Sequence, residues 1–190
     1  MDSMLLYSSG AIVLLLMVGG FFSGSETALT AVSRGRMHQL EKDGSRAAAN
    51  VNALVGNREK LIGTVLLGNT FVNILASSIA TAVLETRLGP HAVAVATAGM
   101  TVIILILAEV LPKTLAIART DRFALAVAGP LRGIVAVLAP VGAAVQLLVW
   151  RVLYLFGVRP ASDESPETAH EEIRGAVDLH HIEGTVERGH

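Results

Sequence analysis

Three long stretches of the chain carry almost no charged side chains, and they constrain the fold more than any other feature. Residues 4–32 contain a single charged side chain, Glu26, and residues 61–84 contain none. Residues 91–111 contain one acid, Glu109. Because a bilayer core of ~30 Å needs about 20 apolar residues in a helix, each stretch predicts a transmembrane helix.

The composition agrees with a membrane protein and argues against several other classes. Of the 190 residues, 52% are hydrophobic and 16% are charged, and the mean hydropathy is +0.58. The 15 basic residues do not exceed the 16 acidic residues, so no nucleic-acid partner is expected. The chain has no cysteine, which excludes disulfides, thiolate metal sites and thiol nucleophiles. We therefore predict an integral membrane protein surrounded by lipid. An intramembrane enzyme with Glu109 and Glu26 as acid and base is an alternative, but no nucleophile motif supports it, so we do not predict an enzyme.

A fourth apolar stretch, residues 123–158, differs from the first three. Two prolines and two arginines interrupt it: Pro130, Pro140, Arg132 and Arg151. Proline breaks or kinks a helix, and arginine at the bilayer centre costs about 3 kcal/mol, so interfacial helices are favoured over a span. We predict a juxtamembrane belt of broken helices here. A fourth span over residues 140–157 is the alternative.

Basic residues set the expected topology. Six of them separate the first two spans, whereas Arg87 alone separates the second and third. By the positive-inside rule, the segment 33–60 and the tail are cytoplasmic, and the N-terminus lies outside the inner or plasma membrane. Hydrophobic spacing within 33–60 predicts two short helices separated at Gly44–Ser45.

The predicted fold class is an all-α, multi-pass membrane protein. It has three transmembrane helices, a juxtamembrane helical belt and a short cytoplasmic helical tail. Residues 1–158 form the transmembrane domain, and residues 159–190 form a polar linker and the start of an acidic helical region. About thirty residues cannot bury a core of their own, so we expect the tail to lead into a further domain.

Polar side chains inside the three spans identify the candidate site. Ser23 and Glu26 are three residues apart in the first span, and Asn69 and Asn73 are four apart in the second. Each pair therefore shares one face of its helix. Glu109 lies near the end of the third span, and an acid inside a membrane is a functional candidate by default.

These side chains offer only oxygen atoms, which favour hard cations such as Mg²⁺ and Ca²⁺ over zinc or copper. Pro112 has no N–H, so it frees the carbonyl of Ala108 as one more oxygen ligand. Structural alternatives remain for each residue. Glu26 can pair with Arg34 or Arg36, and Glu109 with Lys113. The serines, threonines and Asn69 can simply bond a neighbouring helix.

Three short motifs in these spans resemble the signatures of the CNNM/CorC family of magnesium transporters. They read FSGSETAL at residues 22–29, LGNTFVN at 67–73 and AEVLPKT at 108–114. The resemblance implies three transmembrane helices, a helical belt and a homodimer. It also implies a dehydrated Mg²⁺ site facing the cytoplasm, with Mg²⁺ export coupled to the inward movement of Na⁺.

The resemblance also implies roles for particular residues. Ser23 and Glu109 are the firmest expected ligands, followed by Asn73, and the other candidates from the same motifs are Ser25, Glu26, Asn69 and the carbonyl of Ala108. The family's paired CBS domains, through which ATP would bind, are absent from the 190 residues. We expect Mg²⁺ transport; a Mg²⁺ sensor that regulates a partner without moving ions is the alternative.

Overall fold

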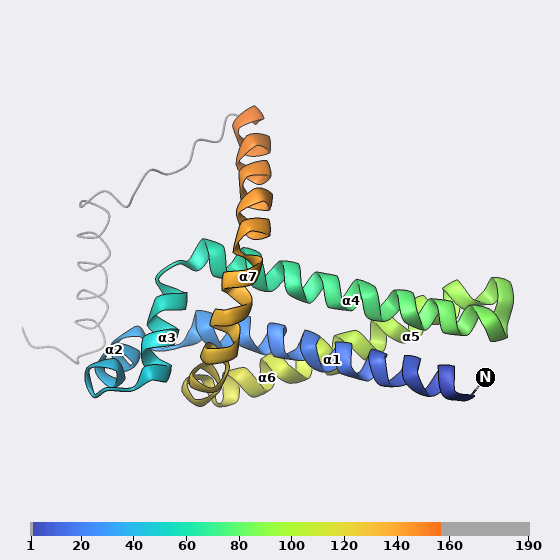
Figure 1. The fold of residues 1–190 in the computed structure, drawn as a ribbon, viewed down its shortest axis with the longest axis horizontal. Helices are drawn as coiled ribbons and strands as arrows, with labels where there is room; N and C mark the ends of the chain where they lie inside the picture. The colour runs from blue at the N-terminus through green and yellow to red at the C-terminus, as the bar shows by residue number, and fades with distance from the viewer. Residues whose placement is uncertain (1, 157–190) are drawn as a thin grey trace, which may run out of the picture. The chain divides into compact units, whose positions relative to one another are not determined.

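The computed structural model describes residues 2–156, and every regular element in that range is helical. Residues up to Gln146 form one compact unit, and the packing described below lies within it. Figure 1 shows the elements, which in chain order are α1 (Asp2–Ala31), α2 (Arg34–Lys42), α3 (Arg46–Val55), α4 (Arg58–Leu88), the 3₁₀ turn η1 (Gly89–His91), α5 (Ala92–Ile103), the π-helix η2 (Ile104–Val110), α6 (Leu111–Ala118) and α7 (Thr120–Leu155).

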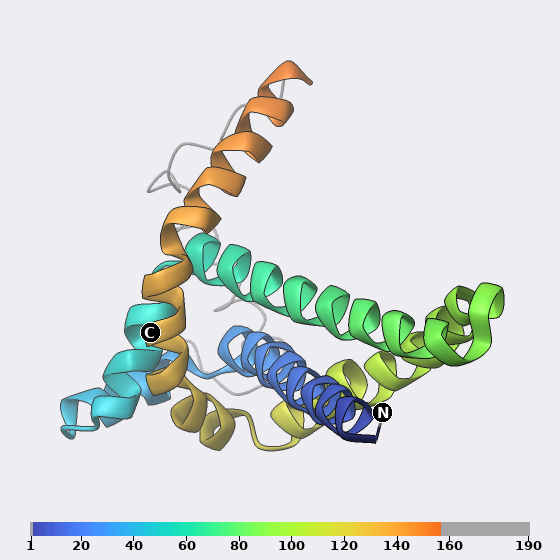
Figure 2. The same cartoon turned by 45° about the vertical axis from the view of Figure 1, so that its right-hand side comes forward.

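Three runs of helix are long and apolar enough to cross a membrane: Leu5–Ala31, Lys60–Ala118 and Thr120–Leu155. The second run turns back on itself at Gly89, whose φ of 52° suits a residue without a side chain. It therefore contains two antiparallel helical arms, α4 on one side and α5, η2 and α6 on the other (Figures 1 and 2). The three predicted spans coincide with α1 and these two arms, so the predicted fold class is confirmed.

Glycines allow α1 and the two arms of the second run to approach closely; these are called the three helical arms below. α1 packs along α4 and also contacts η2 and α6. A Cβ built on Gly68 of α4 would lie 2.6 Å from Cζ of Phe22, and one on Gly24 of α1 would lie 2.6 Å from Cζ of Phe123. Small residues at such contacts are the usual means by which membrane helices associate, because lipid gives no hydrophobic force between them.

Two short helices follow α1, as the sequence predicted. Ser33 caps α2 by accepting from the Arg36 N–H at 3.4 Å, and Ser45 caps α3 by accepting from the Ala48 N–H at 3.3 Å. Gly44 connects them with a φ of 89°, a conformation that side chains disfavour. The predicted separation at Gly44–Ser45 is confirmed.

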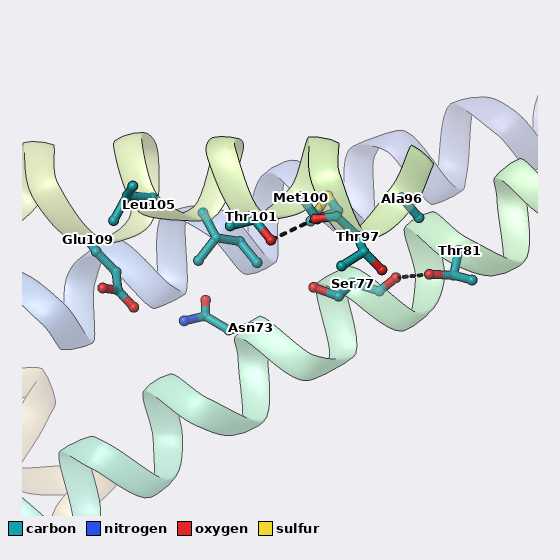
Figure 3. Close-up of a pocket in the computed structure, with 10 residues that line it drawn as sticks. Asn73, Ser77, Thr81, Ala96, Thr97, Met100, Thr101, Leu105 and Glu109 are labelled. Atoms are coloured by element: carbon teal, nitrogen blue, oxygen red, sulfur yellow. Dashed lines mark hydrogen bonds between the residues drawn. The ribbon is translucent and has the colours of Figure 1, made fainter. Parts of the chain in front are cut away.

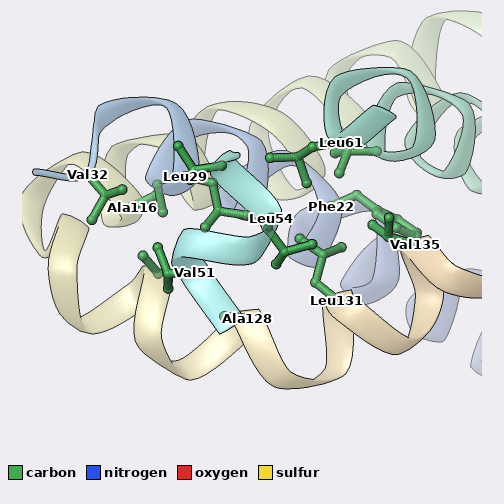
Figure 4. Packing of buried hydrophobic residues seen from close by; sticks show 14 of the residues in the cluster. Phe22, Leu29, Val32, Val51, Leu54, Leu61, Ala116, Ala128, Leu131 and Val135 are labelled. Carbon is green, nitrogen blue, oxygen red and sulfur yellow. The ribbon is translucent and has the colours of Figure 1, made fainter. Parts of the chain in front are cut away.

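The main hydrophobic core lies where α1 ends and α3 and α7 pack against it (Figure 4). Met37 and Val51 are fully buried there, as is Leu131 of α7. Leu29 of α1 and Leu54 of α3 complete the contact. The segment 33–60 thus packs against the bundle through an apolar face.

The predicted breaks in the fourth apolar stretch are wrong, because α7 runs as one helix through Pro130 and Pro140. Arg132 donates to Oδ1 of Asn50 at 2.7 Å, so this arginine has a protein partner instead of an apolar surrounding. Buried residues of α7, including Ala128, belong to the core just described. Tertiary packing of this face compensates for the helical hydrogen bonds that are missing because the prolines have no N–H. The predicted tail, residues 159–190, lies outside the described residues.

Candidate metal centre

The end of α1 carries two serines that are buried without hydrogen-bond partners. Ser23 and Ser25 have no exposed surface, and within the described residues neither Oγ meets a partner. A buried hydroxyl left unpaired costs about 1–3 kcal/mol, so such groups call for an explanation. Glu26 follows on the same helix and is half-buried.

The second contribution comes from two asparagines on successive turns of α4. The Asn73 Nδ2 donates to Oδ1 of Asn69 at 3.5 Å, so the nitrogen end of the Asn73 amide points toward Asn69. Its other end, the Asn73 Oδ1, is buried and has no partner among the described residues. A carbonyl-type oxygen is therefore presented to the interior with its lone pairs free.

The third contribution comes from the π-helix η2, which the sequence did not predict. Its last i+5 bond runs from the Leu111 N–H to the carbonyl of Ile106. The next bond would need an N–H on Pro112, which proline lacks, so the wider register ends there. In this register residue 112 would donate to the carbonyl of Leu107. Because Pro112 has no N–H, the carbonyl left without a donor is that of Leu107, one residue before Ala108. Single π turns occur frequently at functional sites.

Glu109 lies within this π-helix, close to Asn73. Both side chains line one groove between α4 and the η2–α5 arm, and Figure 3 shows them pointing into the same space. Glu109 is half-buried, whereas Ala108 is fully buried and its Cβ faces Gly19 of α1.

Gly19 marks the point where the three helical arms converge. A Cβ at this residue would lie 2.9 Å from the Asn73 Oδ1 and 3.4 Å from the Ala108 Cβ. Since Gly19 faces Asn73 and Phe22 faces Gly68, the antiparallel register of α1 and α4 brings Ser23 level with Asn69. Ser23 and Asn69 thus each lie one turn away from the Gly19–Asn73 contact. Ala108 faces the same glycine, and Glu109 lines the groove with Asn73.

Ser25 and Glu26 are less directly connected to this point. In the described part of the chain no hydrogen bond joins either side chain to Asn73 or Glu109, and the same is true of Ser23. They lie on the α1 turn that follows Ser23, nearer the end of the helix. The roles of all the candidate residues as ligands stay predictions.

The structural alternatives for the two acids are not formed among the described residues. Arg36 pairs with Asp121, with Nη1 and Oδ2 2.8 Å apart, rather than with Glu26. Glu109 makes no ion pair with Lys113 in the same range. No three His, Cys, Asp or Glu side chains gather there either, so a metal bound at Glu109 would need other oxygen ligands as well.

The sequence profile of the family described as the Cyclin M transmembrane N-terminal domain matches residues 10–190. The chain belongs to the CNNM family. It is 35% identical over 167 residues to the UPF0053 inner membrane protein YfjD of Escherichia coli, covering 84% of this chain and 37% of that protein.

Other CNNM relatives come from distant organisms. The chain is 29% identical over 177 residues to the DUF21 domain-containing chloroplastic protein At1g55930 of Arabidopsis thaliana, covering 93% of this chain and 26% of that protein. It is 29% identical over 178 residues to the UPF0053 protein YhdT of Bacillus subtilis, covering 84% of this chain and 38% of that protein. The chain thus spans well under half of these relatives' lengths, and it is a multi-pass membrane domain of their kind.

Proposed function

We propose that this CNNM domain carries Mg²⁺ across the membrane through a site formed by α1, α4 and η2. One observation carries the proposal: the unpartnered oxygens of Ser23 and Asn73 are buried on the arms that meet at Gly19, and Glu109 lines the same groove as Asn73. A bound cation would satisfy these oxygens, whose burial is otherwise unfavourable.

The donor set favours Mg²⁺ over softer metals. All the candidate ligands are oxygens, and Mg²⁺ takes oxygen ligands, whereas zinc and copper prefer nitrogen and sulfur. Glu109 supplies the negative charge that offsets the loss of the ion's hydration shell, while Ser23 and Asn73 supply neutral oxygens. Asn69 orients the Asn73 amide through its hydrogen bond.

Movement of α1 against α4 and η2 would open and close this site. Gly19 and Gly20 of α1 lie against α4, η2 and α6, so such a movement would change the contacts of these two glycines first. Transport by rocking of one helical unit around a fixed ion site is a common scheme in secondary transporters. Export coupled to inward Na⁺ movement, and assembly as a homodimer, are parts of this proposal.

Flux through sealed proteoliposomes tests the proposal. Liposomes containing the protein should take up or release Mg²⁺ faster than protein-free liposomes, and an opposing Na⁺ gradient should change the rate. Mg²⁺ binding without any flux would instead identify a sensor. Failure to bind Mg²⁺ would contradict both roles.

A substitution at Gly19 should weaken Mg²⁺ binding with little effect on folding. In Gly19→Ala the new methyl group would meet the Asn73 Oδ1 at 2.9 Å, and this flexible amide would turn away. Losing one neutral oxygen should lower the affinity about tenfold, equal to ~1.4 kcal/mol. Isothermal titration with Mg²⁺ measures this. Gly10→Ala on the same helix is the control, because no atom lies within 4 Å of its new methyl group.

Cysteine labelling tests the proposed orientation, since the native chain has no cysteine. An Arg46→Cys variant on α3 should react with an impermeant thiol reagent only from the cytoplasmic side. A His91→Cys variant should react only from outside; this residue is exposed and avoids the positive φ of Gly89. Thr168→Cys should react from the cytoplasmic side, and its labelling from outside would establish α7 as a fourth span.

A further inference from the structure

A row of hydroxyl groups leads away from the Glu109 and Asn73 groove along α4. The groove is about 430 Å³ in volume, large enough to hold several water molecules. A second groove adjoins it, because both are lined by Asn73, Ser77 and Thr81, and it ends at Glu85. Asn73, Ser77, Thr81 and Glu85 follow one another at every fourth residue, so each lies one turn beyond the last.

This row crosses a large part of the membrane. Twelve residues separate Asn73 from Glu85, which in a helix corresponds to about 18 Å of the ~30 Å hydrocarbon core. Thr97 and Thr101 of α5 face the same groove from the opposite arm (Figure 3). The two grooves together therefore run from Glu109 to Glu85, which lies one helical turn before η1.

The hydroxyl groups are oriented as acceptors. Thr81 donates its hydroxyl proton to the Ser77 carbonyl at 2.9 Å, and Thr101 donates to the Thr97 carbonyl at 2.7 Å. With the protons directed to their own helices, the oxygen lone pairs face the groove. Both ends carry an acid, Glu109 and Glu85, and no lysine or arginine lines either groove within the described residues. Apolar side chains such as Met100 and Ile104 form the rest of the lining, and its polar part suits a cation and its waters and disfavours an anion.

We infer that this groove is the path by which Mg²⁺ travels between the Glu109 site and the η1 end of the bundle. The inference rests on the proposed function and adds the route to it. Mg²⁺ releases water reluctantly, so an ion leaving the site takes up waters again. The lone pairs of Thr81 and Thr101 accept hydrogen bonds from those waters, which lowers the barrier for passage through the apolar layer.

Threonine-to-valine substitutions test the path, because valine keeps the shape and removes only the oxygen. The double variant Thr81→Val/Thr101→Val should slow Mg²⁺ flux in proteoliposomes about tenfold or more, the effect of a modest rise in one barrier. Mg²⁺ affinity, measured by isothermal titration, should stay unchanged. Thr81→Ser keeps an oxygen at the same place and should retain flux. Thr86→Val is the matched control: Thr86 also donates to its own helix, to the Val83 carbonyl, but lines neither of these two grooves.

The remaining outcomes distinguish this inference from the proposed function. Normal flux in the valine variants with normal Mg²⁺ binding would overturn the path and leave the site intact. A loss of Mg²⁺ affinity in these variants would make the hydroxyls part of the site itself and overturn a separate path. A changed oligomeric mass would assign the hydroxyls to a contact between copies. If the unaltered protein neither binds nor conducts Mg²⁺, the proposed function fails and the path fails with it.

Discussion

Replacing Glu109 with glutamine is expected to abolish Mg²⁺ binding at micromolar-to-millimolar concentrations while leaving the protein folded. Glutamine keeps the shape of the side chain and removes its charge. Glu109 is half-buried in the groove that it shares with Asn73, with no cationic partner among the described residues. Removing one partner of a desolvated charge pair costs about 3 kcal/mol or more, so the affinity should fall at least about a hundredfold.

Thermal stability gives the complementary readout for this substitution. Without Mg²⁺, Glu109→Gln should be as stable as the unaltered protein or more so, because an uncompensated acid has been removed from the membrane interior. The stabilisation that Mg²⁺ gives the unaltered protein should be absent from the variant. Lys113→Met is the control. If Glu109 served only to pair with Lys113, both variants would lose stability alike and Mg²⁺ affinity would hardly change in either.

Replacing Gly68 with alanine is expected to cause the largest loss of stability among single glycine substitutions in α4. The new methyl group would lie 2.6, 2.8 and 2.9 Å from three atoms of the Phe22 ring. That ring is only 4% exposed and belongs to the main core, so it has little room to move. Overpacking of this kind costs about 1–3 kcal/mol.

Gly63→Ala is the matched control for this experiment. It lies in the same helix, and no atom is within 4 Å of its new methyl group. It should be neutral or slightly stabilising, because alanine is the better helix former. The combination of Gly68→Ala with Phe22→Leu should recover part of the lost stability in a thermal melt. Equal stability of Gly68→Ala and Gly63→Ala would show that Phe22 does not pack on Gly68.

The sequence was sufficient to predict the spans, because charge-free stretches leave a membrane helix few alternatives. The capped pair α2 and α3 was also predictable, since Ser45 follows Gly44 and both have local roles in the turn. Tertiary effects account for what was missed. The continuity of α7 depends on Ala128 and Leu131 packing against α1 and α3. The sequence around the two prolines does not reveal this contact.

The sequence predicted which candidate residues share a helix face, but it did not predict the local geometry around them. Helical spacing placed Asn69 and Asn73 on one face, as their hydrogen bond confirms. The π register of η2 was not predictable, because apolar residues such as Ile104 and Leu105 fit α and π turns equally well. Nothing in the sequence singled out Thr81 and Thr101, because their alignment with Asn73 and Glu109 appears only when α4 and α5 lie side by side.

Anomalous scattering from crystals grown with Mn²⁺ in place of Mg²⁺ tests the central claim most directly. Mn²⁺ also prefers oxygen ligands, and its position can be located independently of waters. A single strong peak is expected within ligand distance of the Glu109 carboxylate, the Asn73 Oδ1 and the Ser23 Oγ. A peak confined to other acids, or no peak in this region at Mn²⁺ concentrations that stabilise the protein, would contradict a metal centre formed by α1, α4 and η2.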